Sequence, residues 1–493
     1  MARKKYRPWV VDQAYLFPPT ARDWLPEDHL VFFVRELVCD MDIEPIEWAI
    51  HRKDPRGEAP YDPRMMLALW LYAYASGVHS SRALAKGIVE RVDFRVLAGD
   101  NRPHWTTLNT FRREHRGALK HCFLQVLKVC QDLGLVGLGH VAIDGTKVKA
   151  DASKHKAMSY GRMKTEVSRL EREVDLLMTR SDEIEAAEDR VYGTGDGGHN
   201  LPAELKHRAT RMQRIRESMA ALAAEAAKER ARELRRNAAS KRASADARPD
   251  PQDRMARSLR TKAKQDEAKA DELDGGPDDE PPPPPQQLPK GGRRHVQSGE
   301  PHDQTQRNFT DPESRIMKGR DGFIQAYNCQ AAVDDTHQII VAADVSNQAP
   351  DSHMFAPMLR QVAANIGVPD VTSGDCGYWS NASAESAREL GTTALIPLGR
   401  TKRWKPGEGS PNAPPGGETP RERMAQRMET EAARTEYRKR GRTVEPVFGQ
   451  IKEVTRFRQF SFRGLAAVAS EWLMVCIGHN IRKAWRHGAA APV

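Results

Sequence analysis

The sequence predicts an α/β domain, a mixed sheet flanked by helices, that is interrupted by an α-helical hairpin insertion and preceded by an all-α N-terminal domain. Residues 1–135 carry short amphipathic helical patterns, and residues 155–240 carry two long charged segments with heptad spacing. Short apolar strands alternate with helices in residues 136–154 and 311–493. A chain of 493 residues exceeds the size of one ordinary core, which agrees with several domains.

The N-terminal region, residues 1–135, is expected to be a helical DNA-binding domain. Asp62 can cap a helix that has Pro63 in its first turn, and apolar residues follow at helical spacing. A later helix is expected to begin at Thr106 or Thr107 as its cap.

The polar side of this later helix carries Arg112, Arg113, His115 and Arg116. Short helices that end in a basic one are compatible with a helix-turn-helix-like unit, in which the three arginines would contact DNA. A plain helical bundle with a solvated basic face fits the same pattern, so both interpretations stay open on this evidence.

The region of residues 155–240 is expected to fold back as an antiparallel pair of charged helices. Apolar residues alternate spacings of four and three along both segments: Met163, Val167, Leu170, Val174 and Leu177, then Leu205, Met212, Ile215, Met219 and Leu222. An intramolecular spacer is the preferred interpretation, with a dimerising scaffold as the alternative. Residues 241–310 are charged, Pro-rich and poor in apolar residues, and we expect a largely disordered linker.

The composition favours a polyanionic partner. Lys and Arg number 77 against 67 Asp and Glu, which gives a formal net charge of +10 and favours nucleic acid over a membrane surface. The six cysteines form no CxxC pair and no Cys/His metal spacing, which suits a reducing compartment. No apolar run is long enough to span a bilayer, and the basic N-terminus lacks the apolar stretch of a secretory signal. We expect a cytoplasmic, nucleoid-associated protein without a membrane partner.

Two aspartates stand where short apolar strands are expected to end. Asp144 follows Val141 and Ile143 and is followed by lysines, and Asp375 sits before Gly377 in a similar arrangement. With residues 155–310 set aside, the order of elements is strand, strand, strand, helix, strand, helix, strand, helix. This is the order of a ribonuclease-H-like fold, in which acids on two adjacent strands and on a later helix converge.

The third acid of this set is Glu445, in the segment YRKRGRTVEPVFGQIK. Because Pro446 and Gly449 weaken helix continuity, Glu445 is expected at a kink or at a helix start. Three carboxylates can hold two divalent cations, one activating the attacking oxygen and one stabilising the leaving oxygen in phosphoryl transfer. Hard oxygen ligands with open water positions suit Mg²⁺.

The chain resembles bacterial insertion-sequence transposases of the DDE type, in the branch with a Tyr-Arg-Glu-Lys signature. Tyr437, Arg440, Glu445 and Lys452 match that signature, although four residues separate Arg440 from Glu445 where three are usual. AIDGTKVKA resembles the first Asp motif and GDCGYWS the second. The resemblance covers most of residues 10–150 and 310–485.

The resemblance implies a catalytic and metal-binding triad of Asp144, Asp375 and Glu445. It implies two Mg²⁺ ions, for which Mn²⁺ can substitute, and double-stranded DNA, both terminal inverted repeats and target, as substrate. It also implies a homodimer in the active complex. Cleavage would free a 3′-hydroxyl that attacks target DNA.

Basic residues near the triad are expected to contact DNA phosphates, because the carboxylates repel a phosphodiester until cations neutralise them. The candidates are Lys147, Lys149, Tyr437, Arg440 and Lys452.

Other acids of the sequence, and other activities of the same fold, are alternatives to this interpretation. Asp151, Asp344 and Asp351 match no family motif and are expected to be structural or solvated. A nuclease of the same fold without strand transfer, and a defective or domesticated copy that only binds DNA, are the alternatives to a transposase.

Overall fold

The structure is a computed structural model that describes residues 21–52, 59–192, 203–248, 253–274, 300–319, 322–399 and 419–488. Residues 193–202, between the two hairpin segments, and the proline-rich residues 275–299 of the linker lie outside the described residues. Within the described residues, no helix is long and apolar enough to cross a membrane.

A mixed sheet forms the centre of the molecule. Its central strands run in the order β6–β5–β1–β7–β8, and β4 also pairs with β5, beside its N-terminal half. The strands β5 and β6 are antiparallel to their neighbours, whereas β7 and β8 run parallel to β1. Taken in chain order this is 3-2-1-4-5, the arrangement of a ribonuclease-H-like sheet. The strands of this sheet are β1 (His140–Lys149), β4 (Arg315–Gly319), β5 (Gly322–Asp334), β6 (Ile340–Ser346), β7 (Val371–Ser373) and β8 (Thr393–Leu395).

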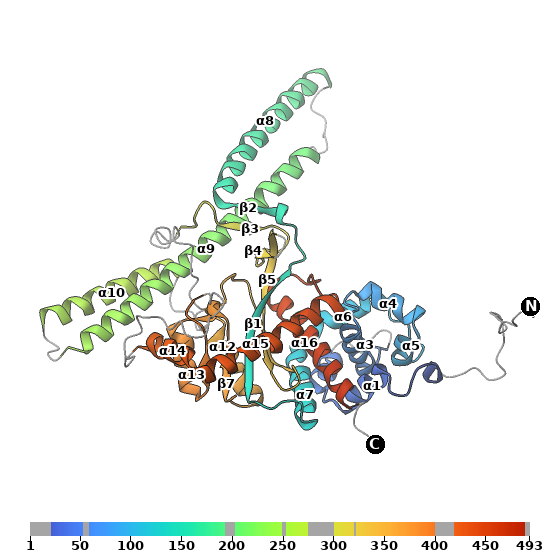
Figure 1. Ribbon diagram of the computed structural model, residues 1–493. Coiled ribbons are helices and arrows are strands. Elements are labelled where there is room, and N and C mark those ends of the chain that lie inside the picture. Colours follow the sequence, from blue (N-terminus) through green and yellow to red (C-terminus); the bar gives the residue numbers. More distant parts are fainter. Residues whose placement is uncertain are drawn as a thin grey trace, which may run out of the picture.

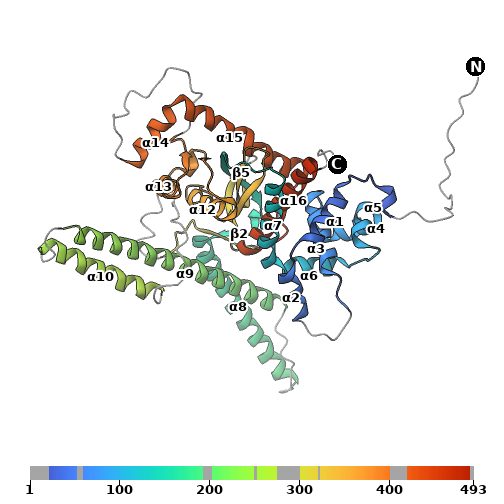
Figure 2. The ribbon, with the colours of Figure 1, turned by 90° about the horizontal axis from the view of Figure 1, so that it is seen from below.

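Helices cover both faces of the sheet. The helix α15 packs on β1 and β5, and α12 packs on β5 and β6, and the two lie on opposite sides of β5 in Figure 2. The last helix, α16, packs on β6 and on the N-terminal helices. The helices of this region are α12 (Phe355–Ile366), α13 (Asn381–Leu390), α14 (Pro420–Glu429), α15 (Glu431–Gly449) and α16 (Leu465–Gly488).

The N-terminal region is helical, as expected. Asp62 caps α3 by accepting hydrogen bonds from the backbone N–H groups of Arg64 and Met65. The helix α6 begins at Trp105 and is capped by His104, so the predicted cap at Thr106 or Thr107 is wrong by two or three residues. The helices are α1 (Leu30–Asp40), α2 (Glu44–His51), α3 (Pro63–Ala75), α4 (Ser81–Glu90), α5 (Val92–Ala98), α6 (Trp105–Glu114) and α7 (Leu119–Asp132).

The N-terminal helices and the sheet share one hydrophobic core. The helices α3 and α7 pack on α16, and the buried residues of both regions form a single cluster. The contact with α3 is close: a Cβ on Gly478 of α16 would lie 2.9 Å from the backbone nitrogen of Ala75. Only glycine permits this approach without a shift of the backbone. The N-terminal region is therefore held firmly against the central sheet.

The insertion contains three helices rather than two. The helices are α8 (Tyr160–Tyr192), α9 (Ala203–Asp246) and α10 (Arg254–Asp274), and α9 is about 66 Å long. Figure 1 shows α8 beside the first half of α9 and α10 beside its second half. The insertion meets the sheet through a small two-stranded ladder of β2 (Ala157–Ser159) and β3 (Gln306–Asn308).

Two different seams hold these helices together. The first follows the expected heptads, with Met163, Val167 and Leu170 packed against Ile215 and Leu222. The second seam is made of alanines at seven-residue spacing, all fully buried: Ala231, Ala238 and Ala245 on α9 and Ala256, Ala263 and Ala270 on α10.

The prediction of disorder is therefore wrong for residues 254–274 of the linker. Small side chains let two helices approach closely although few large apolar residues are present. Ion pairs such as Lys241–Asp266 and Arg242–Glu267 flank this second seam.

The helix α15 continues through Pro446, so the alternative that Glu445 stands at a helix start is wrong. Proline has no N–H, and the carbonyl of Arg442, one turn earlier, loses its helical donor. The side chain of Gln338 replaces that donor, with 2.8 Å from its Nε2 to the carbonyl oxygen. A π-helical turn over Gln450–Val454 follows α15 and brings Lys452 to β1.

Candidate active site

The pairing of β1 with β7 brings the first two predicted acids together. The prediction that β1 ends at Asp144 is wrong, because β5 pairs with β1 as far as Lys149. The partner on the other edge is much shorter, since β7 pairs only as far as Ala142 with Ser373. Asp144 therefore lies two residues beyond the point where one edge of β1 becomes free. Asp375 lies two residues beyond the matching point on the parallel strand.

Asp144 is a half-buried carboxyl with an unusual electrostatic environment. Its Oδ2 lies 2.8 Å from Nη2 of Arg440, and its Oδ1 accepts a hydrogen bond from the backbone N–H of Gly145. Burial, assisted by the charges of Asp375 and Asp351, raises the pKa of Asp144 to about 6, although Arg440 and Gly145 act in the opposite direction. The ionised form of Asp144 is therefore short of positive charge.

Asp351 is an acid of this site that the sequence analysis dismissed. It lies in the loop between β6 and α12, and its Oδ1 accepts hydrogen bonds from Asn328 and Gln330 of β5 at 2.6 and 2.9 Å. Lys147 forms an ion pair with the same oxygen at 3.4 Å. The expectation that Asp351 is merely structural or solvated is therefore incomplete, because its charge reaches Asp144. A local motif gave no signal, since strand pairing and the loop create this proximity.

Glu445 is on the helix that faces the two aspartates, but its carboxylate is not gathered with theirs. The side chain is exposed, and its Oε1 lies 3.8 Å from the place where a Cβ on Gly441 would be. Among the described residues, the predicted triad does not form a group with all ligand atoms within 4.8 Å of one another. The two aspartates lie near each other, and Glu445 stays a predicted third ligand.

The other residues of the Tyr-Arg-Glu-Lys signature do reach this part of β1. Arg440 binds Asp144, and Lys452 donates hydrogen bonds to the hydroxyl of Thr146 and to the carbonyl of Lys147. Burial lowers the pKa of Lys452. Burial raises the pKa of Tyr437, with a smaller contribution from the charge of Asp375 in the same direction.

The predicted DNA contact of Arg112 is wrong, because this side chain belongs to the core. Its side chain is 3 % exposed, and its Nη1 lies 3.7 Å from Oε1 of the fully buried Glu471. It also donates hydrogen bonds to the hydroxyls of Tyr74 and Ser461. The helical pattern alone could not reveal this role, because Glu471 lies 359 residues further along the chain.

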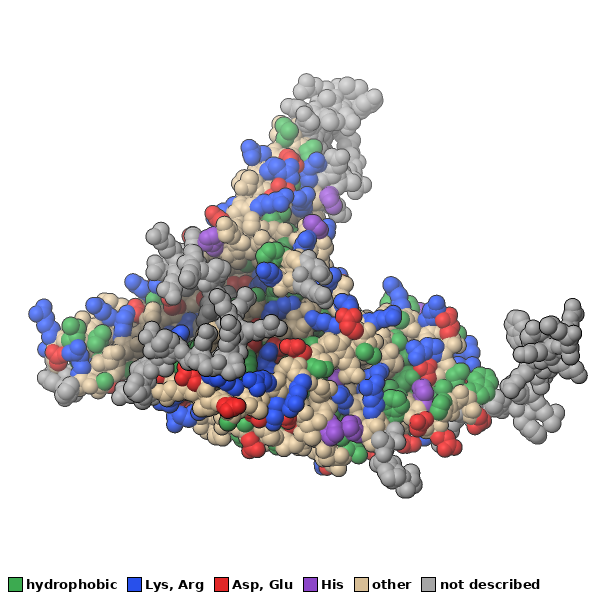
Figure 3. All heavy atoms as spheres, viewed as in Figure 1, with side chains coloured by type: hydrophobic (Ala, Val, Ile, Leu, Met, Phe, Trp, Pro, Cys, Tyr) green, Lys and Arg blue, Asp and Glu red, His purple; other side chains and the backbone are tan. Residues whose placement is uncertain are grey.

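Four other predicted contacts remain at the surface or close to it. Arg113, Arg116 and Lys149 are exposed, whereas Lys147 is half-buried in its ion pair with Asp351. Figure 3 shows Lys and Arg side chains scattered over the face of the molecule on which α15 and α16 lie. These positions are open to a phosphate backbone, and nothing else in the structure assigns them to DNA.

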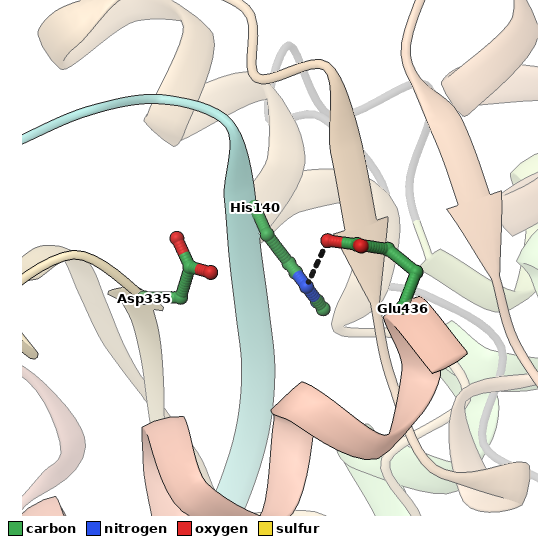
Figure 4. A group of neighbouring side chains, drawn as sticks. All are labelled: His140, Asp335 and Glu436. Carbon is green, nitrogen blue, oxygen red and sulfur yellow. Dashed lines mark hydrogen bonds and ion pairs between the residues drawn. The ribbon is translucent and has the colours of Figure 1, made fainter. Parts of the chain in front are cut away.

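A second charged group lies near the start of β1 (Figure 4). Ligand atoms of His140, Asp335 and Glu436 all lie within 4.8 Å of one another. Both ring nitrogens of His140 are engaged, Nδ1 with Glu436 at 3.0 Å and Nε2 with the hydroxyl of Ser373 at 2.7 Å. Lys439 lies 2.7 Å from Glu436 and 3.8 Å from Asp335. A protein cation thus already occupies the place where a metal would act.

The donor chemistry around Asp144 does fit a divalent cation. Carboxylates of Asp144, Asp351 and Asp375 face two basic groups, Arg440 and Lys147, so negative charge is in excess. All three acids offer hard oxygen ligands, which suit Mg²⁺ or Mn²⁺. Burial is the main cause of the raised pKa of Asp144, and the charges of Asp375 and Asp351 add to it.

Two family models match the chain. Residues 297–481 match the family described as Transposase DDE domain, and residues 19–114 match the one described as Transposase domain (DUF772). No curated protein and no solved structure matches the chain. The segment of residues 297–481 contains Asp375 and Glu445. Asp144 lies between the two matched segments, and the pairing of β1 with β7 brings it to the site.

The fold and the matched segments together define a class of DNA-processing protein. The two matches support a DNA transposase of the DDE type, in which the helical match precedes the catalytic one.

Proposed function

We propose that this chain is an insertion-sequence transposase of the Tyr-Arg-Glu-Lys branch that cuts element ends and joins them to target DNA. Asp144, Asp375 and Glu445 are the proposed catalytic and metal-binding residues. The observation that carries the proposal is the register of β7 on β1, which sets Asp375 level with Asp144 beside a helix that contributes Arg440. The family of residues 297–481 favours the same activity.

The protein groups around the site have separate tasks in this proposal. Arg440 and the N–H of Gly145 hold the carboxylate of Asp144 in one orientation. Two Mg²⁺ ions, when bound, would supply an activated water and neutralise the leaving oxygen. Lys149 lies exposed at the end of β1, where it can bind a phosphate and position the strand.

Recognition of the element ends is proposed for the N-terminal helices. Arg113 and Arg116 remain exposed at the end of α6, unlike Arg112, and are the candidates for phosphate contacts. The active complex is proposed to contain two copies of the chain, one for each element end.

A strand-transfer assay tests the proposal. Labelled duplexes that carry the DNA flanking the coding sequence are incubated with the protein, Mg²⁺ and a supercoiled plasmid. We expect label joined to the plasmid, and no joining by the Asp144→Asn variant although it still binds the ends. Asp344→Asn, a change of another half-buried acid of the sheet, is the matched control and is expected to join normally.

Each other result would contradict the proposal. Nicked plasmid without joined label would indicate a nuclease of the same fold. Binding without any cleavage would indicate a DNA-binding protein only. Joining by Asp144→Asn would remove Asp144 from the catalytic role.

A further inference from the structure

Asp351 has one oxygen that the protein fixes and one that it leaves free. Its Oδ1 accepts hydrogen bonds from Asn328 and Gln330 and is paired with Lys147. No described residue donates to its Oδ2. Two donors and a cation on one oxygen set the direction of the whole carboxylate, so the free oxygen has a defined position.

The free oxygen of Asp351 borders the same space as Asp375. The position that a Cβ would take on Gly377 lies 3.8 Å from Oδ2 of Asp351 and 3.0 Å from Oδ1 of Asp375. No protein cation is paired with either of these two oxygens among the described residues. The backbone N–H of Gly377 donates to Oδ1 of Asp375, and the absence of a side chain on Gly377 leaves space between the two carboxylates.

A second glycine lets Asp351 approach β1. A Cβ on Gly145 would lie 2.8 Å from Oδ1 of Asp351 and 2.5 Å from Nε2 of Gln330, which leaves no room for a side chain. Gly145 directly follows Asp144, so Asp351 approaches β1 one residue away from the first predicted acid. The charge of Asp351 accordingly contributes to the raised pKa of Asp144.

A buried oxygen without a donor lies at the same place. Asn328 is fully buried, and its Nδ2 donates to Asp351 and to the carbonyl of Gln348, which fixes the orientation of the amide. Its Oδ1 then has no hydrogen-bond partner and lies 3.0 Å from the Cβ position of Gly145. An unpaired buried acceptor is costly, and this one belongs to the side chain that holds the carboxylate of Asp351, so a cation bound there would have a further oxygen nearby.

We propose that Asp351 is a fourth carboxylate of the cation-binding centre and holds a divalent cation together with Asp375. The inference deepens the proposed function, on which it rests. Lys147 and the amides of Asn328 and Gln330 then act as positioning residues for Asp351. The sequence motif of three acids describes the centre incompletely.

Mn²⁺ binding to the full chain without DNA tests this inference. Free Mn²⁺ is measured by electron paramagnetic resonance during titration of the wild type and of Asp351→Asn, Asp344→Asn, Asp144→Asn and Asp375→Asn. We expect Asp351→Asn to bind Mn²⁺ at least tenfold more weakly and Asp344→Asn to bind it as the wild type does. Asp351→Glu, which keeps the charge, is expected to bind more tightly than Asp351→Asn.

The outcomes separate this inference from the proposed function. Normal Mn²⁺ affinity in Asp351→Asn, with weakened affinity in Asp144→Asn and Asp375→Asn, would overturn the role of Asp351 alone. Normal affinity in all three would overturn the metal centre itself.

Hydrogen exchange of the wild type provides an answer should the variants fail to fold. Mn²⁺ is then expected to slow exchange in residues 346–354 as well as near Asp144 and Asp375. Slowing near the two aspartates alone would contradict the inference.

Discussion

Two charged groups lie four residues apart on β1 and face the same helix, yet they are built in opposite ways. Around His140, the acids Glu436 and Asp335 meet a histidine and Lys439. Around Asp144, three acids meet Arg440 and the more distant Lys147. We call the first group closed because both of its carboxylates pair with Lys439, at 2.7 and 3.8 Å. We call the second group open because, among the described residues, Arg440 pairs with Asp144 and Lys147 with Asp351 but no cation pairs with Asp375.

This difference separates a structural cluster from a site. Spacing alone would favour the His140 group as a metal centre, because its ligand atoms already lie within 4.8 Å of one another. The positions of the cations reverse that preference, since Lys439 pairs with both carboxylates there, whereas no cation among the described residues pairs with Asp375. The His140 group fastens α15 to β1, and α15 carries Arg440 and Glu445 toward the open group.

The largest expected effect follows from removing one carboxylate of the open group. Asp375→Asn should lower the rate of strand cleavage in Mg²⁺ by at least about a thousandfold, because one carboxylate less holds the catalytic cations. Glu436→Gln in the closed group should cleave within about threefold of the wild type. Rates are measured on a labelled end duplex, and equal losses in both variants would erase the distinction between the groups.

Arg112 and Glu471 form a second closed group, and its contribution to the stability of the fold can be measured. Arg112→Ala should lower the free energy of unfolding by about 3–5 kcal/mol, because it leaves the buried carboxylate of Glu471 without its cation. Arg113→Ala, one residue along the same helix and exposed, should change it by less than about 0.5 kcal/mol.

Urea denaturation monitored by circular dichroism measures both changes of this pair. Weaker DNA binding by Arg113→Ala with little change in stability would agree with its proposed role. A small stability loss for Arg112→Ala would show that its pairing with Glu471 matters little.

The open group also predicts a pH dependence. The pKa of Asp144 is about 6 in the folded protein and near 3.8 when unfolded, so the folded state binds the proton more tightly. The contribution of Asp144 to stability therefore falls as pH rises from about 4 to 6, by roughly 3 kcal/mol in total. In the presence of a chelator, Asp144→Asn should lack this loss of stability. The stability of the variant relative to the wild type should therefore rise over that pH range. Parallel pH profiles of the two proteins would contradict the environment described for Asp144.

The smallest expected effect concerns the closed group itself. Glu436→Gln should lower the free energy of unfolding by about 1–3 kcal/mol. The buried ring nitrogen of His140 then keeps only a neutral partner, and Lys439 loses its ion pair with Glu436. Mn²⁺ affinity should not change, since this group already contains its own cation. A loss of Mn²⁺ binding in Glu436→Gln would identify the His140 group as a metal site.

Much of the fold was predictable from local patterns in the sequence. The alternation of strands and helices predicted the order β1, β5, β6, α12, β7, α13, β8, α15, and the heptads of Met163 and Ile215 predicted the first insertion seam. The alanine seam of α10 was not predictable from hydrophobicity, because close packing of small side chains leaves no large apolar stripe.

The candidate site was predictable only in part, for a related reason. Asp144 and Asp375 could be proposed because both stand near expected strand ends and match a family motif. The burial of Arg112 and the position of Asp351 depend on contacts between segments far apart in the sequence. Local spacing carries no signal for such contacts, and only the assembled fold brings them together.

The central claim is that Asp144, Asp375 and Glu445 surround one cation-binding centre. It is tested most directly by loading the wild-type chain with Fe²⁺, generating hydroxyl radicals with ascorbate and peroxide, and mapping the backbone cuts by mass spectrometry. We expect cuts near residues 144, 375 and 445 that excess Mg²⁺ suppresses. Cuts near residue 335 with none near 375, or no cut near 445, would contradict the claim.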